Sequence, residues 1–128
     1  MKRIVLIDDD SSTNFLNRLV IEKSELVDEI LTFESGKEAL DYFKGRIETE
    51  DGSLILLDIN MPIMNGWEFM EEYVALNGKL KSNKVVVLTS SIDPVDKQKA
   101  EENIQVVEMK SKPLSPTILK ELVSKYLN

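Results

Sequence analysis

Short apolar segments alternate along the chain with longer segments in which apolar residues recur at helical spacing. The apolar segments are rich in β-branched residues, and Leu54–Leu57 and Val85–Leu88 are apolar at every position, which is typical of strands covered on both faces. This pattern predicts five strands: Ile4–Ile7, Glu29–Phe33, Leu54–Leu57, Val85–Leu88 and Gln105–Met109.

Helices are predicted after each of these strands. Three amphipathic helices are marked by their apolar residues: Phe15, Leu16, Leu19, Val20 and Ile21; Ala39, Leu40 and Phe43; Trp67, Met70, Tyr73 and Val74. Two more are predicted from an N-cap residue followed by proline, at Asp93-Pro94 for a short helix and at Ser115-Pro116 for a last helix through Leu127. Five strand–helix repeats predict an α/β fold with a doubly wound, five-stranded parallel sheet that has helices on both faces.

Length and composition limit the classes of protein to consider. At 128 residues the chain has the size of one domain, covering residues 1–128, with no effector domain expected. The net charge of −7 disfavours nucleic acid and anionic membrane as partners. No segment approaches the roughly 20 apolar residues that cross a bilayer, and three aspartates interrupt the first apolar segment. We therefore expect a cytoplasmic protein.

Polar side chains gather where four of the predicted strands end. The sequence places Asp8-Asp9-Asp10 after the first strand, Asp58 after the third, Thr89-Ser90-Ser91 after the fourth and Ser111-Lys112-Pro113 after the fifth. Parallel strands bring these ends to one edge of the sheet, where ligands bind in such folds. Two carboxylates about 4 Å apart repel by about 4 kcal/mol at an effective dielectric near 20, so the cluster requires a neutralising cation. Because the chain contains no histidine and no cysteine, oxygen ligands and a hard cation are expected.

These residues resemble those of response-regulator receiver domains of two-component signalling. The resemblance covers essentially the whole chain and is to stand-alone receivers of the chemotaxis type. It rests on five motifs in the same order: Asp8-Asp9, Asp58, Met61-Pro62 with Gly66, Thr89, and Lys112-Pro113. It implies the flavodoxin-like (βα)5 receiver fold.

The resemblance also implies a role for each matching residue. Asp58 corresponds to the phosphorylated aspartate. Asp8, Asp9, Asp58 and the backbone carbonyl of Asn60 correspond to the Mg²⁺ ligands, with Asp8 acting largely through water; Mn²⁺ can substitute. The Thr89 hydroxyl and Lys112 correspond to the groups that contact the acyl phosphate. In this family the positions of Asn60 and Ser91 tune the rate at which the acyl phosphate hydrolyses.

The implied partners are proteins. A sensor histidine kinase or a histidine phosphotransfer protein is the expected donor, and the downstream target is expected on the face of the fourth helix, fifth strand and fifth helix. The expected activities are self-phosphorylation and autodephosphorylation, without a separate turnover substrate. Met109 departs from the family, because an aromatic switch residue usually stands three residues before the lysine.

Simpler interpretations and rival functions remain beside this one. Asp10 is expected to cap the first helix, and Met61, Pro62 and Gly66 to shape a loop, while Trp67 and Met70 are expected in the core. A phosphatase of the haloacid dehalogenase type needs a second acid two residues after its nucleophile, where this chain has Asn60. A flavodoxin-like binding module needs a phosphate loop rather than three aspartates. A degenerate receiver that only binds partners would not need all five motifs.

Overall fold

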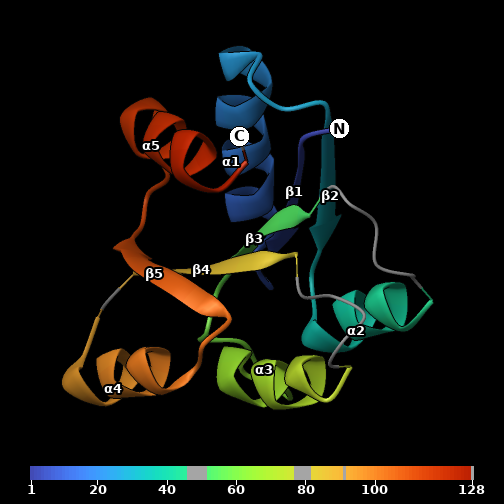
Figure 1. Cartoon of the computed structure of the whole chain (residues 1–128), viewed down its shortest axis with the longest axis vertical. Coiled ribbons are helices and arrows are strands. Elements are labelled where there is room, and N and C mark those ends of the chain that lie inside the picture. Colours follow the sequence, from blue (N-terminus) through green and yellow to red (C-terminus); the bar gives the residue numbers. More distant parts are fainter. Residues whose placement is uncertain (46–51, 77–81, 91, 128) are drawn as a thin grey trace.

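The computed structural model describes residues 1–45, 52–76, 82–90 and 92–127 of the chain. Within these residues strands and helices alternate from end to end (Figure 1). The elements are β1 (Arg3–Ile7), α1 (Ser11–Ser24), β2 (Glu29–Phe33), α2 (Gly36–Lys44), β3 (Ser53–Leu57), α3 (Gly66–Val74), β4 (Lys84–Thr89), α4 (Pro94–Glu102), β5 (Val106–Ser111) and α5 (Pro116–Tyr126).

The strands form one parallel sheet in the order β2-β1-β3-β4-β5. The register aligns Ile7 at the end of β1 with Leu57 at the end of β3, and it aligns Thr89 with Ser111 on the other side of the sheet. The polar residues that follow these positions therefore meet at one edge. The chain reverses its winding direction between β1 and β3, and in open α/β sheets ligands bind outside the strand ends at such a point.

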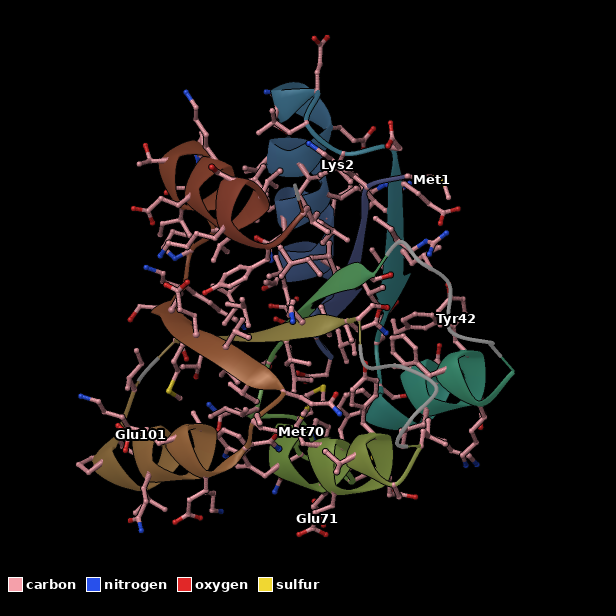
Figure 2. All side chains as sticks on the ribbon, viewed as in Figure 1. Met1, Lys2, Tyr42, Met70, Glu71 and Glu101 are labelled. Carbon is pink, nitrogen blue, oxygen red and sulfur yellow. The ribbon has the colours of Figure 1, made fainter. Side chains whose placement is uncertain are left out.

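Two helical layers cover the sheet, as predicted. Figure 1 shows α1 and α5 on one face and α2, α3 and α4 on the other. Successive side chains of β1 point to opposite faces of the sheet and so pack in both cores. Ile4 and Leu6 lie in the core beneath α1 and α5, while Val5 and Ile7 lie in the core beneath α2 and α3. Figure 2 shows Met70 of α3 directed toward the sheet, in agreement with its predicted place in the core, and Glu71 directed away from it.

The predicted helix starts are confirmed. The side chain of Asp93 accepts from the N–H of Asp96, and Pro94 occupies the first position of α4. Ser115 accepts from the N–H of Ile118 at the start of α5 in the same way.

The apolar face of α1 differs from the prediction. Of the five apolar residues that marked this helix only Ile21 is buried, while Phe15 and Leu16 are 60% and 59% exposed. The buried positions of the first two turns are instead taken by Asn14 and Asn17, with exposures of 5% and 6%. The start of α1 therefore packs through amides near the strand ends and turns an apolar patch outward.

The last strand begins and ends later than predicted. It runs over Val106–Ser111 instead of Gln105–Met109, so Lys110 and Ser111 belong to the ladder although both are polar. This strand lies at an edge of the sheet, where partly exposed faces accommodate polar side chains.

An ionic network attaches α5 to β5. The Glu108 carboxylate on β5 accepts from the Tyr126 hydroxyl at 2.5 Å and pairs with Lys125 at 3.3 Å and with Lys110 at 3.1 Å. Lys110 also approaches Glu121 of α5, with 3.7 Å between the charged atoms. Burial, followed by the hydrogen bond to Glu108, raises the pKa of Tyr126 to about 12, so the phenol stays a donor at physiological pH.

The start of α3 depends on a close backbone approach at Gly66. The Gly66 N–H donates to the carbonyl of Ile59 at 3.0 Å. A Cβ at this position would lie 2.6 Å from the Cα of Ile59, which no side-chain rotation relieves. The predicted loop role of Gly66 therefore has a steric cause. Asn65 and Glu68 complete the helix start as a capping box.

Gly66→Ala is expected to lower the free energy of unfolding by about 2 kcal/mol, because overpacking forces the backbone of the β3–α3 loop to move. Gly45→Ala is the matched control, since the nearest atom to its added Cβ is a carbonyl oxygen at 3.8 Å. Urea denaturation of both variants measures the difference. Equal stability of the two variants would contradict a steric requirement at Gly66.

Candidate functional site

Three carboxylates from two strand ends converge at the reversal point of the sheet. The ligand atoms of Asp8, Asp9 and Asp58 all lie within 4.8 Å of one another. Asp8 and Asp58 are buried, with exposures of 4% and 5%, whereas Asp9 is exposed. The cluster therefore opens to solvent on the side of Asp9, and its spacing suits a hard cation held by oxygen.

The backbone ladders continue past the strands and fix these residues. The Asp58 N–H donates to the carbonyl of Ile7 at 2.9 Å, and the Asp8 N–H donates to that of Phe33 at 3.1 Å. On the other side of the site, the Lys112 N–H donates to the carbonyl of Thr89 at 2.7 Å. The functional side chains thus stand on the rigid sheet edge rather than on free loops.

Lys112 supplies the positive charge of the cluster. Its Nζ lies 2.6 Å from Oδ2 of Asp8 and 3.7 Å from Oδ2 of Asp58. Burial works against the charged ammonium, but the hydrogen bond to Asp8 and the charge of Asp58 outweigh it and raise the pKa of Lys112. One lysine therefore bridges the ends of the first and third strands from the end of the fifth.

The Asp58 carboxyl is harder to ionise than an ordinary aspartate. Burial raises its pKa from 3.8 to about 6, and the charges of Asp8 and Asp9 add to the increase. The hydrogen bond from the N–H of Asn60, at 3.2 Å, and the charge of Lys112 offset part of this increase. A single lysine is therefore insufficient to neutralise the site, which agrees with the expectation of a metal.

Thr89 lies within the site and is fully buried. Its hydroxyl oxygen accepts from the side-chain amide of Asn60 at 3.3 Å. Asn60 therefore contacts both sides of the site, Asp58 through its backbone N–H and Thr89 through its side chain. A group added to Asp58 would share these neighbours.

The three consecutive aspartates have different positions, because Asp10 caps α1 while Asp8 and Asp9 belong to the acidic cluster. As predicted, Asp10 is the N-cap: its carboxylate accepts from the Ser12 N–H and the Thr13 hydroxyl, both at 3.0 Å, and these bonds lower its pKa. The Asp10 N–H in turn donates to Oδ1 of Asp8 at 2.9 Å.

One residue that supports the site was missed from the sequence. The side-chain amide of Asn14 donates to the carbonyl of Asp8 at 2.9 Å and to that of Phe33 at 3.3 Å. It holds the backbone of the acidic pair against α1. An asparagine one turn after an N-cap carries no such signal in the sequence.

The structure thus brings together five predicted site residues: Asp8, Asp9, Asp58, Thr89 and Lys112. Asn60 lies beside them, and the metal-binding role of its carbonyl stays a prediction. Ser91 lies outside the described residues.

The family model for the response regulator receiver domain matches residues 4–124. The chain belongs to this family. The match takes in all five strands, apart from Arg3 at the start of β1, and all of the site. The alternatives of a phosphatase or of a flavodoxin-like binding module receive no support.

Named relatives agree with this assignment. The chain is 33% identical over 93 residues to the response regulator Rcp1 of Synechocystis sp., covering 70% of this chain and 63% of the length of Rcp1. It is 32% identical over 124 residues to a chemotaxis protein CheY homolog of Campylobacter jejuni, covering 91% of this chain and 86% of that protein. A response regulator receiver protein from Dyadobacter fermentans has a similar structure, with a TM-score of 0.89, 28% identity and 98% coverage of both chains.

Receiver domains are signalling modules that take phosphoryl groups from histidine kinases or phosphotransfer proteins and bind Mg²⁺ at an acidic pocket. The acidic cluster of this chain lies where that pocket is expected.

Among the described residues, no helix is long and apolar enough to span a bilayer.

The raised pKa of Asp58 predicts a stability that depends on pH when metal is chelated. The native state binds this proton more tightly than the unfolded state, whose carboxyl titrates near 3.8. The contribution is therefore present below about pH 4 and is lost as pH rises through about 6, a difference of about 2–3 kcal/mol. Urea denaturation between pH 4 and 7 measures it.

Asp58→Asn is the control, because an amide does not titrate. This variant is expected to lose this part of the pH dependence and to be more stable than wild type at pH 7. The same slope in both proteins would show that the buried charge of Asp58 is not its source.

Proposed function

We propose that this receiver domain accepts a phosphoryl group on Asp58 from a phosphohistidine of another protein. The observation that carries the proposal is the position of Asp58, a buried carboxylate between two other carboxylates and Lys112. Because the chain has no histidine, the phosphohistidine belongs to a sensor histidine kinase or a histidine phosphotransfer protein. Residues 1–128 act together as one phosphoacceptor domain.

The carboxylates of Asp8, Asp9 and Asp58 and the carbonyl of Asn60 form the proposed ligand set for Mg²⁺, with Mn²⁺ as a substitute. The spacing of the three carboxylates and their hard oxygen donors support this choice. When bound, the cation neutralises the carboxylates and the oxygens of the transferring phosphoryl group. Asp58 acts as the nucleophile in its ionised form, which neighbouring positive charge favours.

In the proposed transfer, an Asp58 oxygen attacks phosphorus in line with the bond that breaks. The P–N bond of the donor breaks, its electron pair returns to the imidazole nitrogen, and an acyl phosphate forms on Asp58. Such a transfer requires positioning and charge stabilisation more than covalent chemistry. In this proposal Lys112 pairs with a phosphoryl oxygen, and the 3.7 Å distance between its Nζ and Oδ2 of Asp58 supports that role.

Phosphorylation adds acceptor oxygens next to Thr89. In the proposed switch, the Thr89 hydroxyl leaves Asn60 and donates to the phosphoryl group, which moves the segment that leads into α4. The readout is a protein target in the cytoplasm that binds the face of α4, β5 and α5. The acyl phosphate ends by hydrolysis on Asp58, so no separate substrate turns over.

The exposed apolar patch of α1 is the proposed docking site for the donor protein. Phe15 and Leu16 lie one turn beyond the acidic residues. Leu16 also lines a cavity of about 570 Å³ with Pro113, which adjoins Lys112 in the chain. A helical donor domain seated on this patch would bring its phosphohistidine to the open side of the acidic cluster.

Acetyl phosphate with Mg²⁺ is expected to add one phosphoryl group to wild type, because the acceptor carries the catalytic groups. Intact-mass analysis detects the product. Asp58→Ala should show no addition, and Asp9→Asn should need far more Mg²⁺ because the nucleophile is present but a ligand is lost. Equal incorporation in wild type and Asp58→Ala would refute the assignment of the acceptor.

Phe15→Ala and Leu16→Ala are expected to slow phosphotransfer from a histidine kinase by about tenfold, because truncating an important interface residue costs more than about 1 kcal/mol. Phosphorylation by acetyl phosphate should not change, because that donor needs no docking surface. The donor is found by phosphotransfer profiling against purified histidine kinases. Val74→Ala, an exposed apolar residue of α3 on the other face of the sheet, is the matched control.

Loss of both reactions in the α1 variants would place Phe15 and Leu16 in folding rather than docking. Unchanged kinase-dependent transfer would move the docking site elsewhere.

A further inference from the structure

Helix α4 is weakly anchored to the rest of the domain. None of its residues, Pro94–Glu102, all of which the structure describes, is buried, and Val95 is 60% exposed. A cavity of about 490 Å³ lies on its side toward α3, and another of about 400 Å³ lies on its side toward β5. The helix therefore lacks the apolar packing that normally fixes a helix on a sheet, and single polar contacts gain weight in holding it.

One such contact joins α4 to α3. The indole N–H of Trp67 donates to Oδ1 of Asp96 at 2.9 Å. Trp67 is the second residue of α3, and Asp96 lies in the first turn of α4. The two side chains are half-buried, and the acceptor is charged, so leaving it unpaired costs more than breaking an ordinary surface hydrogen bond. Figure 1 shows the two helices side by side on the same face of the sheet.

Both ends of this hydrogen bond connect to the phosphoacceptor site. Trp67 follows Gly66, whose N–H is held by the carbonyl of Ile59, the residue after Asp58. Asp96 follows Asp93, the N-cap of the helix that begins after Thr89. The bond therefore links the segment that carries the acceptor to the segment that carries the switching hydroxyl.

We propose that the Trp67–Asp96 hydrogen bond is a tether that holds α4 in its unphosphorylated position. This inference rests on the proposed function. When Thr89 turns toward a phosphoryl group, the start of α4 must shift while the start of α3 is retained by the Gly66–Ile59 contact, so the indole and the carboxylate separate. The tether sets how much of the free energy of phosphorylation is needed to move α4. Trp67 and Asp96 are positioning residues, because neither reaches the reacting atoms.

The proposal predicts reciprocal effects on the acceptor site. If the tether favours the unphosphorylated position, its loss raises the fraction of molecules that are already competent, and a phosphoryl mimic binds more tightly. Mg²⁺ with beryllofluoride is the probe, and fluorine NMR measures its affinity without depending on tryptophan. Trp67→Phe and Asp96→Ala are each expected to bind it about fivefold more tightly than wild type.

Three further variants separate the hydrogen bond from other effects. Asp96→Asn retains an acceptor oxygen but not its charge, so it should bind beryllofluoride less tightly than Asp96→Ala does. Glu101→Ala removes an exposed carboxylate from the same helix and should also behave as wild type. The double variant Trp67→Phe/Asp96→Ala should match each single variant, because both substitutions remove the same bond.

Unchanged affinity in both single variants would overturn the proposal. So would additive effects in the double variant. Binding by Asp96→Asn as tight as that by Asp96→Ala, or tighter binding by Glu101→Ala than by wild type, would also overturn it, since either would indicate charge rather than the bond. Trp67 is the single tryptophan of the chain, so its emission gives an independent signature. Emission of ligand-free Asp96→Ala should resemble that of wild type with beryllofluoride, whereas an emission identical to ligand-free wild type would also contradict the tether.

A separate measurement distinguishes failure of the tether from failure of the proposed function. In the ligand-free protein, Asp96→Ala should raise amide exchange in α4 by about tenfold while α5 is unchanged, because local opening governs exchange. If wild type does not bind beryllofluoride at Asp58, the proposed function fails whatever the exchange shows. If wild type binds it and α4 exchange is the same in both proteins, the tether alone fails.

Discussion

The burial of like charges at the ends of neighbouring strands is the constraint on which the rest of this domain depends. Asp8 and Asp58 stand at the carboxyl ends of β1 and β3, where the apolar strands behind them leave little solvent to stabilise charge. Carboxylates at such spacing repel by several kcal/mol. Lys112 relieves part of this repulsion, and it reaches the site only because β5 belongs to the same parallel sheet. The position of β5 at the edge of the sheet therefore allows Lys112 to reach the buried carboxylates and offset part of their repulsion.

This arrangement explains why an acidic cluster can be both stable and reactive. The apolar core on both faces of the sheet contributes the stability, so the site itself does not have to be optimal. The residual repulsion favours the binding of a cation. It also makes the pKa of Asp58 depend on the positive charge near it. Energetically unfavourable arrangements of groups, held in place by the surrounding structure, are common at functional sites.

Much of the fold was predictable because its signals are local. Fully apolar β-branched segments indicated buried parallel strands, and Asp93-Pro94 and Ser115-Pro116 indicated helix starts through hydrogen bonds within four residues. The bounds of β5 were not predictable, because Lys110 and Ser111 pair as strand residues only through their neighbour β4. The outward apolar patch of α1 was missed for a similar reason. The buried side chain of Asn14 donates hydrogen bonds to the carbonyls of Asp8 and Phe33, which belong to two different strand ends. Hydrophobic periodicity alone cannot predict such bonds.

The candidate site was predictable to the same extent. The order of polar residues at strand ends, with the family resemblance, predicted which side chains meet. It did not predict which of them pair, since Lys112 lies closer to Asp8 than to Asp58. The hydrogen bond between Trp67 and Asp96 lies beyond sequence patterns, because it joins two helices whose relative position only the folded chain defines.

The ionic network between β5 and α5 means that α4 and α5, the two helices of the proposed target-binding face, are anchored to different degrees. Glu108 holds Tyr126 and Lys125, so α5 keeps its place against the sheet, whereas α4 has no comparable attachment through buried side chains in the part of the chain that the structure describes. If a target binds this proposed face, its contacts with α5 are the same in both states and add equally to both affinities. Discrimination between the phosphorylated and unphosphorylated protein must come from contacts with α4, because a ligand shifts an equilibrium only by its differential affinity. A target that bound α5 alone would bind the phosphorylated and the unphosphorylated protein with equal affinity.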